Sequence, residues 1–437
     1  MYTTARSART QWLERTRPKP MTLFLQMVFV YVALQAFAFA FESGLFRLMS
    51  NAFALWLFGV ALVNTLFLMP SHDRGGAPTI GLGLVLGFGL YYMGMGGNLI
   101  LLRGNNDLQD WAKIFMAPAF LLFGFVFASR KEQDVLASPL NRLLFWLLVL
   151  LPIAVWGLQL AMGRTSLGGG QTVGTFVNRN NASLYYLTLI AFYACLGQRQ
   201  ISNVLVYLLA GMAFGTLGVL LAVLLSLMIS VGKPRYLPHL LLVAVLACVL
   251  AFALPQEWVL ARLERVLLSY RLLMEGRINL RTVTYAELVQ MLGTSDLSFI
   301  FRLKHWVDLW DLYVAGTPYQ QLFGFGVGAS VLRSEMHLVP HNDYVRYLFE
   351  CGAISLAGFV TILWVSMRTI GRTWGAVPLL GVVIYFFSEN LINNTLAMTI
   401  FYFSLGSAVF RAREARAQAR QEASLSRTTP ASPVPLV

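Results

Sequence analysis

Long apolar stretches alternate with short polar segments along most of the chain. A helix needs about 20 apolar residues to cross the hydrocarbon core of a bilayer. We predict about twelve such spans, at residues 21–41, 50–70, 77–97, 111–128, 142–162, 181–197, 203–215, 217–231, 237–254, 345–367, 375–391 and 396–410. A transmembrane barrel would instead alternate apolar and polar residues over segments of about 10 residues. The pattern therefore predicts an all-α, polytopic integral membrane protein.

The composition agrees with a membrane protein, because 57% of the residues are apolar and only 12% are charged. The chain has 33 Lys and Arg against 20 Asp and Glu, which gives a formal charge of +13. In a soluble protein this excess would suggest nucleic-acid binding. Here most of it lies in short loops and tails, where the positive-inside rule accounts for it. We expect the lipid bilayer as a partner and no nucleic acid.

Residues 203–231 decide the predicted orientation, since they are too many for one ordinary span and too few for two full ones. Two short helices in this stretch would place the basic loops and the basic tails, 1–20 and 411–437, on one side of the membrane. A single span would put the later basic clusters outside, against the positive-inside rule. We therefore predict that both termini are cytoplasmic.

Residues 255–344 contain no full span and are expected on the outer, periplasmic side. Apolar residues from Trp258 to Leu273 recur at helical spacing, which predicts an amphipathic helix on the membrane surface. A second helix is expected at about 296–315. These features predict an ordered, helical periplasmic subdomain between spans nine and ten. The expected organisation is a basic tail at 1–20, spans at 21–254, the loop subdomain at 255–344, spans at 345–410 and a basic, disordered tail at 411–437.

Ionisable residues are rare within the predicted spans, which argues against an ion-coupled transporter, because such charges mark a transport path. Glu389 is a clear carboxylate in a late span, and we interpret it, with the asparagines after it, as a hydrogen-bonded interface cluster. The three cysteines lie in apolar segments and form no disulfide or metal pattern. Polar residues gather instead in the outer segments 163–182 and 255–344, which places the chemistry at the outer membrane surface.

Three polar motifs lie in these outer segments. The first is GTFVNRNN at 174–181, directly before a predicted span. The second is RLKHW at 302–306, followed by GFGVG at 324–328. The third is PHNDY at 340–344, followed by ECG at 350–352. We expect the three glycines of GFGVG to form a turn with positive φ rather than a phosphate-binding loop.

In this order and placement, the motifs resemble those of the O-antigen ligase/polymerase superfamily of membrane glycosyltransferases. The resemblance extends to the layout, since that family has about twelve spans and a large late outer loop. The chain departs from it at 214–218, FGTLG, where many members carry a Ser-Arg-Gly-like motif, so another arginine would have to substitute. The resemblance implies transfer of a glycan from an undecaprenyl-diphosphate carrier to an acceptor hydroxyl.

The resemblance also implies roles for individual residues. His341 is the expected general base, a task suited to imidazole, which titrates near neutral pH. Arg302 is the first expected diphosphate ligand, because a planar guanidinium pairs with phosphate oxygens and stays charged. Further candidate donor ligands are Arg265, Arg179 and Arg164, and other candidate contacts are His337, Asn342, Asn178, Asn181 and Trp306. No metal and no cofactor are expected, since arginines would neutralise the leaving diphosphate.

Several of these residues have a purely structural alternative. Arg302 would pair with Asp308 or Asp311 on a solvated helix face. Arg265 would anchor the amphipathic helix to lipid headgroups, and His337 would be a surface histidine.

The expected function is that of an O-antigen ligase in the bacterial inner membrane. Such an enzyme joins the glycan of undecaprenyl-diphosphate-linked O-antigen to lipid A–core oligosaccharide, by a metal-independent, inverting displacement at the periplasmic face. The alternative is an O-antigen or exopolysaccharide polymerase, whose acceptor is a second carrier-linked glycan. The motifs do not separate these two, because both share the donor and the base. A polysaccharide or lipid transporter without chemistry is the third possibility.

Overall fold

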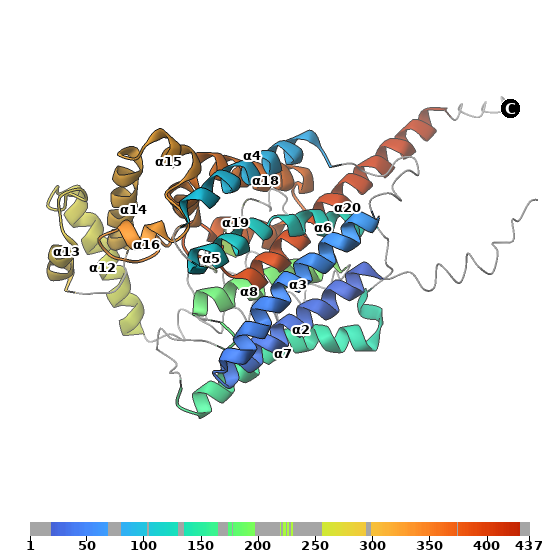
Figure 1. Ribbon diagram of the computed structural model, residues 1–437, viewed down its shortest axis with the longest axis horizontal. Coiled ribbons are helices and arrows are strands. Elements are labelled where there is room, and N and C mark those ends of the chain that lie inside the picture. The colour runs from blue at the N-terminus through green and yellow to red at the C-terminus, as the bar shows by residue number, and fades with distance from the viewer. Residues whose placement is uncertain are drawn as a thin grey trace, which may run out of the picture.

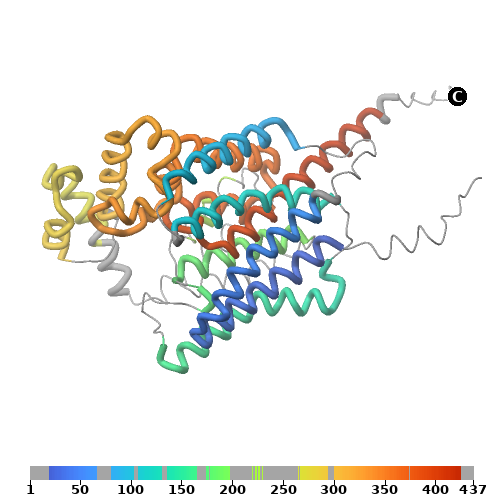
Figure 2. The backbone as a smooth tube through the Cα atoms, in the orientation of Figure 1, coloured from blue at the N-terminus to red at the C-terminus, as the bar shows by residue number. Residues whose placement is uncertain are grey.

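A computed structural model describes residues 19–68, 80–102, 105–129, 135–164, 174–196 except 177, the single positions 219, 222, 223, 225, 226 and 229, and residues 256–293 and 299–428 except 374. Within these ranges all regular secondary structure is helical, and they contain no strand. Figures 1 and 2 show long helices running side by side in a bundle, with short helices gathered at one end of it. The prediction of an all-α fold is confirmed for the described part of the chain.

The bundle is built from helices that come before residues 256–351 in the sequence and from helices that follow them. Its members are α2 (Pro20–Ala40), α3 (Gly44–Leu68), α4 (Leu82–Asn98) with a 3₁₀ turn at Leu99–Leu101, α5 (Asn105–Met116), α6 (Ala119–Ala128), a 3₁₀ turn at Val135–Ala137, α7 (Pro139–Ala161), α8 (Arg179–Cys195), α18 (Gly352–Ile370), α19 (Ala376–Tyr385) and α20 (Thr395–Thr428).

Seven helical segments of the described residues are long and apolar enough to cross a membrane. They are Pro20–Ala40, Gly44–Thr65, Leu82–Leu101, Asp107–Ala128, Pro139–Ala161, Asp343–Ile370 and Thr395–Ser424. This content is typical of a membrane protein, as the apolar pattern predicts. The predicted spans 203–215, 217–231 and 237–254 lie wholly or almost wholly outside the described residues, so a total of twelve stays a prediction.

Helix α19 ends earlier than the apolar pattern predicts. The predicted span continues to residue 391, whereas the helix stops at Tyr385, so Glu389 lies in the connection to α20 and not within a helix. Tertiary hydrogen bonds hold this connection in place of helical ones. The carbonyl oxygen of Phe386 accepts from the backbone N–H of Asp343 at 2.8 Å, and the backbone N–H of Leu391 donates to the Asp343 carboxylate at 2.8 Å.

Glycines let the bundle helices approach at backbone distance. A Cβ on Gly124 of α6 would overlap the carbonyl oxygen of Phe403 in α20, and one on Gly406 would overlap that of Leu121. In a membrane no hydrophobic effect drives helices together, because lipid is as apolar as the helix surfaces. Small residues that allow close backbone packing are therefore common where such helices associate.

The short helices at the end of the bundle come from the long segment between α8 and α18. They are α12 (Gln256–Met274), α13 (Tyr285–Leu292), α14 (Phe299–Val314), α15 (Pro318–Phe323), α16 (Ala329–Arg333) and α17 (Asp343–Arg346), which leads through a π-helical turn at Tyr347–Cys351 into α18. The two helices predicted within 255–344 are confirmed as α12 and α14. Leu272, Leu288 and Phe301 belong to a small apolar core of their own.

The GFGVG segment forms the predicted turn. Gly324, Gly326 and Gly328 all have positive φ, between 82° and 95°. The backbone N–H groups of Phe325 and Gly326 donate to the carbonyl oxygens of Phe349 and Glu350 at 2.9 and 3.1 Å. A Cβ on Gly324 would overlap the Glu350 carbonyl. The glycines therefore serve a close backbone contact with the π-helical turn.

Candidate functional site

The centre of the candidate site is a carboxylate that contacts two of the residues predicted from sequence. Glu389 Oε2 lies 3.2 Å from Nδ1 of His341, and its Oε1 lies 3.3 Å from Nη2 of Arg302. The side chain of Glu389 is only 10% exposed, while those of Arg302 and His341 are 27% and 25% exposed. The site is thus partly open, with Glu389 more buried than either His341 or Arg302.

Helix α14 supplies two side chains from one face. Arg302 and Trp306 are four residues apart, which places them one above the other on a helix. Arg302 also donates from Nη1 to the carbonyl oxygen of Ser388 at 3.0 Å. Trp306 donates from Nε1 to the carbonyl oxygen of Pro340 at 2.6 Å. The helix therefore holds both the segment that carries Glu389 and the segment that carries His341.

His341 has an unusual backbone conformation. Its φ is +49°, a region that non-glycine residues seldom occupy and that histidine enters more often than most. The next residue, Asn342, caps α17 by accepting from the backbone N–H groups of Tyr344 and Val345 at 3.0 and 3.2 Å. Strained residues of this kind persist where the surrounding structure fixes them, and they cluster at functional sites.

The first motif reaches the same connection. Asn178 caps α8 by accepting from the backbone N–H of Asn181 at 2.9 Å. Asn394 then donates from Nδ2 to Oδ1 of Asn181 at 3.1 Å. We call residues 386–394 the α19–α20 connection. Residues of all three motifs contact it: Asn181 of the first, Arg302 of the second, and His341 and Asp343 of the third.

A buried ionic cluster supports the site from within the bundle. Arg346 Nε donates to Oε2 of Glu350 at 3.0 Å, and Ser330 Oγ donates to its other oxygen at 2.5 Å. Glu350 and Asp343 are fully buried. Pairing of a buried carboxylate in this way offsets its cost of desolvation. The cluster fixes the turn between α17 and α18, and therefore the start of the helix that follows His341.

The other polar groups of α14 form a separate network. Asp308 accepts from Lys304 and, at 3.2 Å, from the hydroxyl of Tyr285. His305 is buried, and burial lowers its pKa to about 4. Burial first, and then the charge of Asp308, raises the pKa of the Tyr285 hydroxyl. His305 is therefore neutral near pH 7, and Arg302 is the charged α14 side chain that contacts Glu389.

The expected pairing of Arg302 with Asp308 or Asp311 is wrong, because both acids pair elsewhere. Asp308 pairs with Lys304, and Asp311 lies 3.2 Å from Arg281. His337 is an exposed histidine whose Nδ1 lies 3.0 Å from the carbonyl oxygen of Val331, as the surface interpretation predicts.

Of the remaining candidate arginines, Arg164 binds the end of α2. Arg164 donates to the carbonyl oxygen of Ala40 at 2.9 Å and lies 3.6 Å from Glu42, at the end of α2. Arg179 is the first residue of α8, next to the capping Asn178. Arg265 lies in α12, but its side chain is outside the described residues, as is the whole 214–218 segment.

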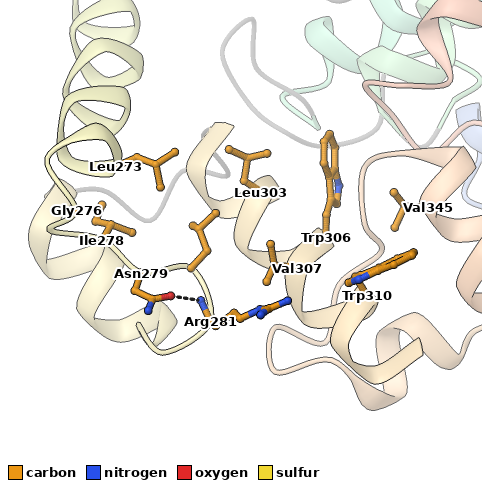
Figure 3. A pocket seen from close by; sticks show the side chains of 11 residues that line it. Leu273, Gly276, Ile278, Asn279, Arg281, Leu303, Trp306, Val307, Trp310 and Val345 are labelled. Carbon is orange, nitrogen blue, oxygen red and sulfur yellow. Dashed lines mark hydrogen bonds between the residues drawn. The ribbon is translucent and has the colours of Figure 1, made fainter. Parts of the chain in front are cut away.

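An apolar groove adjoins the site. It has a volume of about 780 Å³ and is lined by Leu273, Gly276, Ile278, Asn279, Leu280, Arg281, Leu303, Trp306, Val307, Trp310 and Val345. Figure 3 shows these side chains between α14 and the segment that follows α12. Trp306 lines the groove with its ring and fixes the residue before His341 with its N–H, so the groove and the site share a wall.

Glu389 is the site residue whose role the sequence did not reveal. Its signal was a carboxylate among apolar residues, which by itself does not identify a partner far away in the sequence. Among the described residues, no three His, Cys, Asp or Glu side chains are close enough to hold a metal ion. The absence of a metal or cofactor requirement stays a prediction.

A scan of known protein families and a search of curated proteins found no match to this chain.

Proposed function

We propose that the chain is a lipid-diphosphate-dependent glycosyltransferase, and specifically an O-antigen ligase that transfers the glycan of undecaprenyl-diphosphate-linked O-antigen to lipid A–core oligosaccharide. The observation that carries this proposal is the meeting of three separate motifs at the α19–α20 connection, where His341 and Arg302 share Glu389. These motifs suggested the family by their order alone, and their assembly in space is an independent argument for a common site.

The proposed setting is the bacterial inner membrane, with about twelve spans, both termini in the cytoplasm, and residues 255–344 as a periplasmic subdomain. The long apolar helices support this setting. The basic end of α20 and the short helices around the site lie at opposite ends of the bundle, as this topology requires (Figure 1). A site at the periplasmic end would meet both lipid-linked substrates in the outer leaflet.

In the proposed reaction the acceptor hydroxyl oxygen forms a bond to the anomeric carbon of the donor sugar. The bond from that carbon to the diphosphate oxygen breaks, and the diphosphate leaves with the electron pair. His341 takes the hydroxyl proton. Arg302 stabilises the charge that develops on the leaving diphosphate. Nη1 and Nη2 each carry a second N–H beside the one that binds Ser388 or Glu389, so donor capacity remains for the diphosphate.

The test uses the purified full-length protein with carrier-linked glycan and lipid A–core, a chelator, and no nucleotide. We expect a glycan-extended lipid A–core product from the wild type and none from His341→Ala. His337→Ala is the matched control, because His337 is also a histidine with positive φ but is exposed and lies outside the site. We expect it to retain activity.

The same assay separates the other functions. If the carrier-linked chains lengthen while lipid A–core is ignored, the protein is a polymerase. If neither product forms although the carrier lipid binds, the transporter possibility replaces the enzyme. If activity requires an added divalent cation, the metal-independent mechanism is wrong.

A further inference from the structure

Glu389 contacts the two functional side chains with different oxygens, and this arrangement has a consequence for the base. A carboxylate oxygen only accepts hydrogen bonds, so the contact at 3.2 Å requires the proton of the neutral His341 ring to sit on Nδ1. Nε2 of the ring then carries the free electron pair. The tautomer of a histidine is set in this way by the partner of its other nitrogen.

The position of Glu389 is itself fixed by the chain around His341. The α19–α20 connection is bound to Asp343 through the backbone groups of Phe386 and Leu391, both at 2.8 Å. Arg302 binds the same connection through the carbonyl of Ser388. Hydrogen bonds from Asp343 and Arg302 thus fix the segment that carries Glu389. A residue that positions another side chain must itself be held in this way.

The charged and titratable groups that face His341 come from two neighbouring elements. The α19–α20 connection contributes Glu389, and α14 contributes Arg302 and His305. His305 is buried and neutral near pH 7. The guanidinium of Arg302 has only hydrogen-bond donors, so it cannot accept a hydrogen bond from the ring of His341. Glu389 is therefore the acceptor that selects the tautomer.

We propose that Glu389 is the positioning residue of the site, which holds Nδ1–H of His341 and the guanidinium of Arg302 together so that Nε2 of His341 faces the acceptor as the base. This inference rests on the proposed function, because His341 acts as a base only if the protein catalyses the proposed transfer. The pairing itself has a readout that does not depend on any transfer reaction.

That readout is the tautomer of His341, measured by ¹⁵N NMR on full-length protein with ring-labelled histidine in lipid nanodiscs. The signal is assigned by its loss in His341→Gln. In the wild type at pH 8 we expect the neutral ring to be protonated at Nδ1. In Glu389→Ala we expect a shift toward the Nε2-protonated form, which is the usual preference of a free imidazole. Asn393→Ala is the matched control, because Asn393 lies in the same connection but donates to Asp110.

The variants are then compared in transfer assays. Glu389→Ala is expected to lose about 100-fold in rate, because the proposed base His341 loses the hydrogen bond that sets its tautomer. Glu389→Gln keeps an oxygen that can accept from Nδ1–H and is expected to regain about 10-fold over Ala. A merely structural residue would not show this rescue together with the change of tautomer.

The outcomes separate the two proposals. An unchanged tautomer in Glu389→Ala, in protein that keeps the wild-type thermal midpoint, overturns the role of Glu389. A protonated Nε2 in the wild type overturns it as well. If the tautomer shifts as expected but the wild type transfers no glycan, the pairing stands and the proposed function falls. If Glu389→Ala does not fold, the tautomer of the wild type still tests the pairing, because a ring protonated at Nε2 overturns it.

Discussion

The carboxylate of Asp343 accepts a hydrogen bond from the backbone N–H of Leu391 at 2.8 Å, which joins the residues after His341 to the segment that carries Glu389. The two segments are far apart in the sequence, yet a fully buried side chain fixes one to the other. The position of His341 relative to Glu389 therefore depends on a third residue, Asp343.

Replacing Asp343 by Ala should destabilise the protein. The change leaves the backbone N–H of Leu391 without its buried acceptor, a loss of about 1–3 kcal/mol. We expect a clear drop in the thermal unfolding midpoint in detergent. Asp311→Ala is the control, because Asp311 pairs with Arg281 where both side chains are exposed, and it should shift the midpoint little. Equal midpoints for the two variants would contradict the role of Asp343.

Replacing Arg302 by Lys should lower transfer activity while the fold is kept. A lysine carries the charge but lacks the planar fork that reaches Ser388 and Glu389 together. We expect a loss of roughly 10-fold to 100-fold in rate at an unchanged thermal midpoint. The matched variant is Arg281→Lys, at an exposed ion pair on the groove rim, and wild-type-like activity is expected from it. Full activity of Arg302→Lys would show that simultaneous contact with Ser388 and Glu389 is not needed.

Replacing Trp306 by Phe should loosen the segment before His341. The aromatic ring stays in the groove wall, but the hydrogen bond to Pro340 is lost, at a cost of about 1 kcal/mol. We expect slower transfer and faster hydrogen exchange at the backbone amides of His341 and Asn342. Trp310→Phe changes a tryptophan that lines the same groove and should leave that exchange rate unchanged. Similar exchange in both variants would show that the indole N–H does not hold this segment.

Replacing Gly324 by Ala should be far more damaging than replacing Gly293. Gly293 has a left-handed αL backbone, where a substitution costs about 1 kcal/mol in strain, whereas Gly324, at φ 87° and ψ −179°, lies in a region that essentially only glycine adopts. A Cβ on Gly324 would also overlap the carbonyl oxygen of Glu350, whereas Gly293 has open space around that position. Thermal midpoints measured side by side should drop much more for Gly324→Ala. Equal drops would mean that the turn adjusts without cost.

Acidification should destabilise the protein partly through His305. Its pKa falls from 6.5 to about 4 on folding, because burial disfavours the charged ring. The unfolded chain therefore binds the proton more readily, and stability is lost as the pH falls from about 6.5 to 4. His305→Gln should flatten the dependence of the thermal midpoint on pH in this window, while His337→Gln, at an exposed histidine, should not. Parallel curves for wild type and His305→Gln would refute this assignment.

Much of the local structure could be predicted from the sequence. Apolar periodicity located α12 and α14, and the turn role of the glycines at 324–328 follows from their freedom at positive φ. These features depend on residues close together in the chain. The early end of α19 could not be predicted, because it depends on hydrogen bonds from Asp343, which lies far earlier in the sequence.

The candidate site divides in the same way. His341, Arg302 and the asparagines of the first motif could be selected from residue types and motif order. Glu389 could be noticed as a carboxylate, but its contacts with His341 and Arg302 depend on the tertiary fold. Pairing on α14 follows helical spacing, since Asp308 lies four residues after Lys304, whereas Arg302 is at neither i,i+3 nor i,i+4 spacing from Asp308 or Asp311.

Helix α20 begins directly after the α19–α20 connection and continues unbroken for 34 residues. At 1.5 Å per residue this is a rod of about 51 Å, well beyond the roughly 30 Å of hydrocarbon in a bilayer. Its first turn is anchored through Asn394, whose Oδ1 accepts from the backbone N–H of Ala397, and its last turns leave the bundle (Figure 1). One continuous helix thus joins the candidate site to the far end of the bundle. A fluorophore on the last turns of α20 would therefore report a tilt of the helix that begins beside the site.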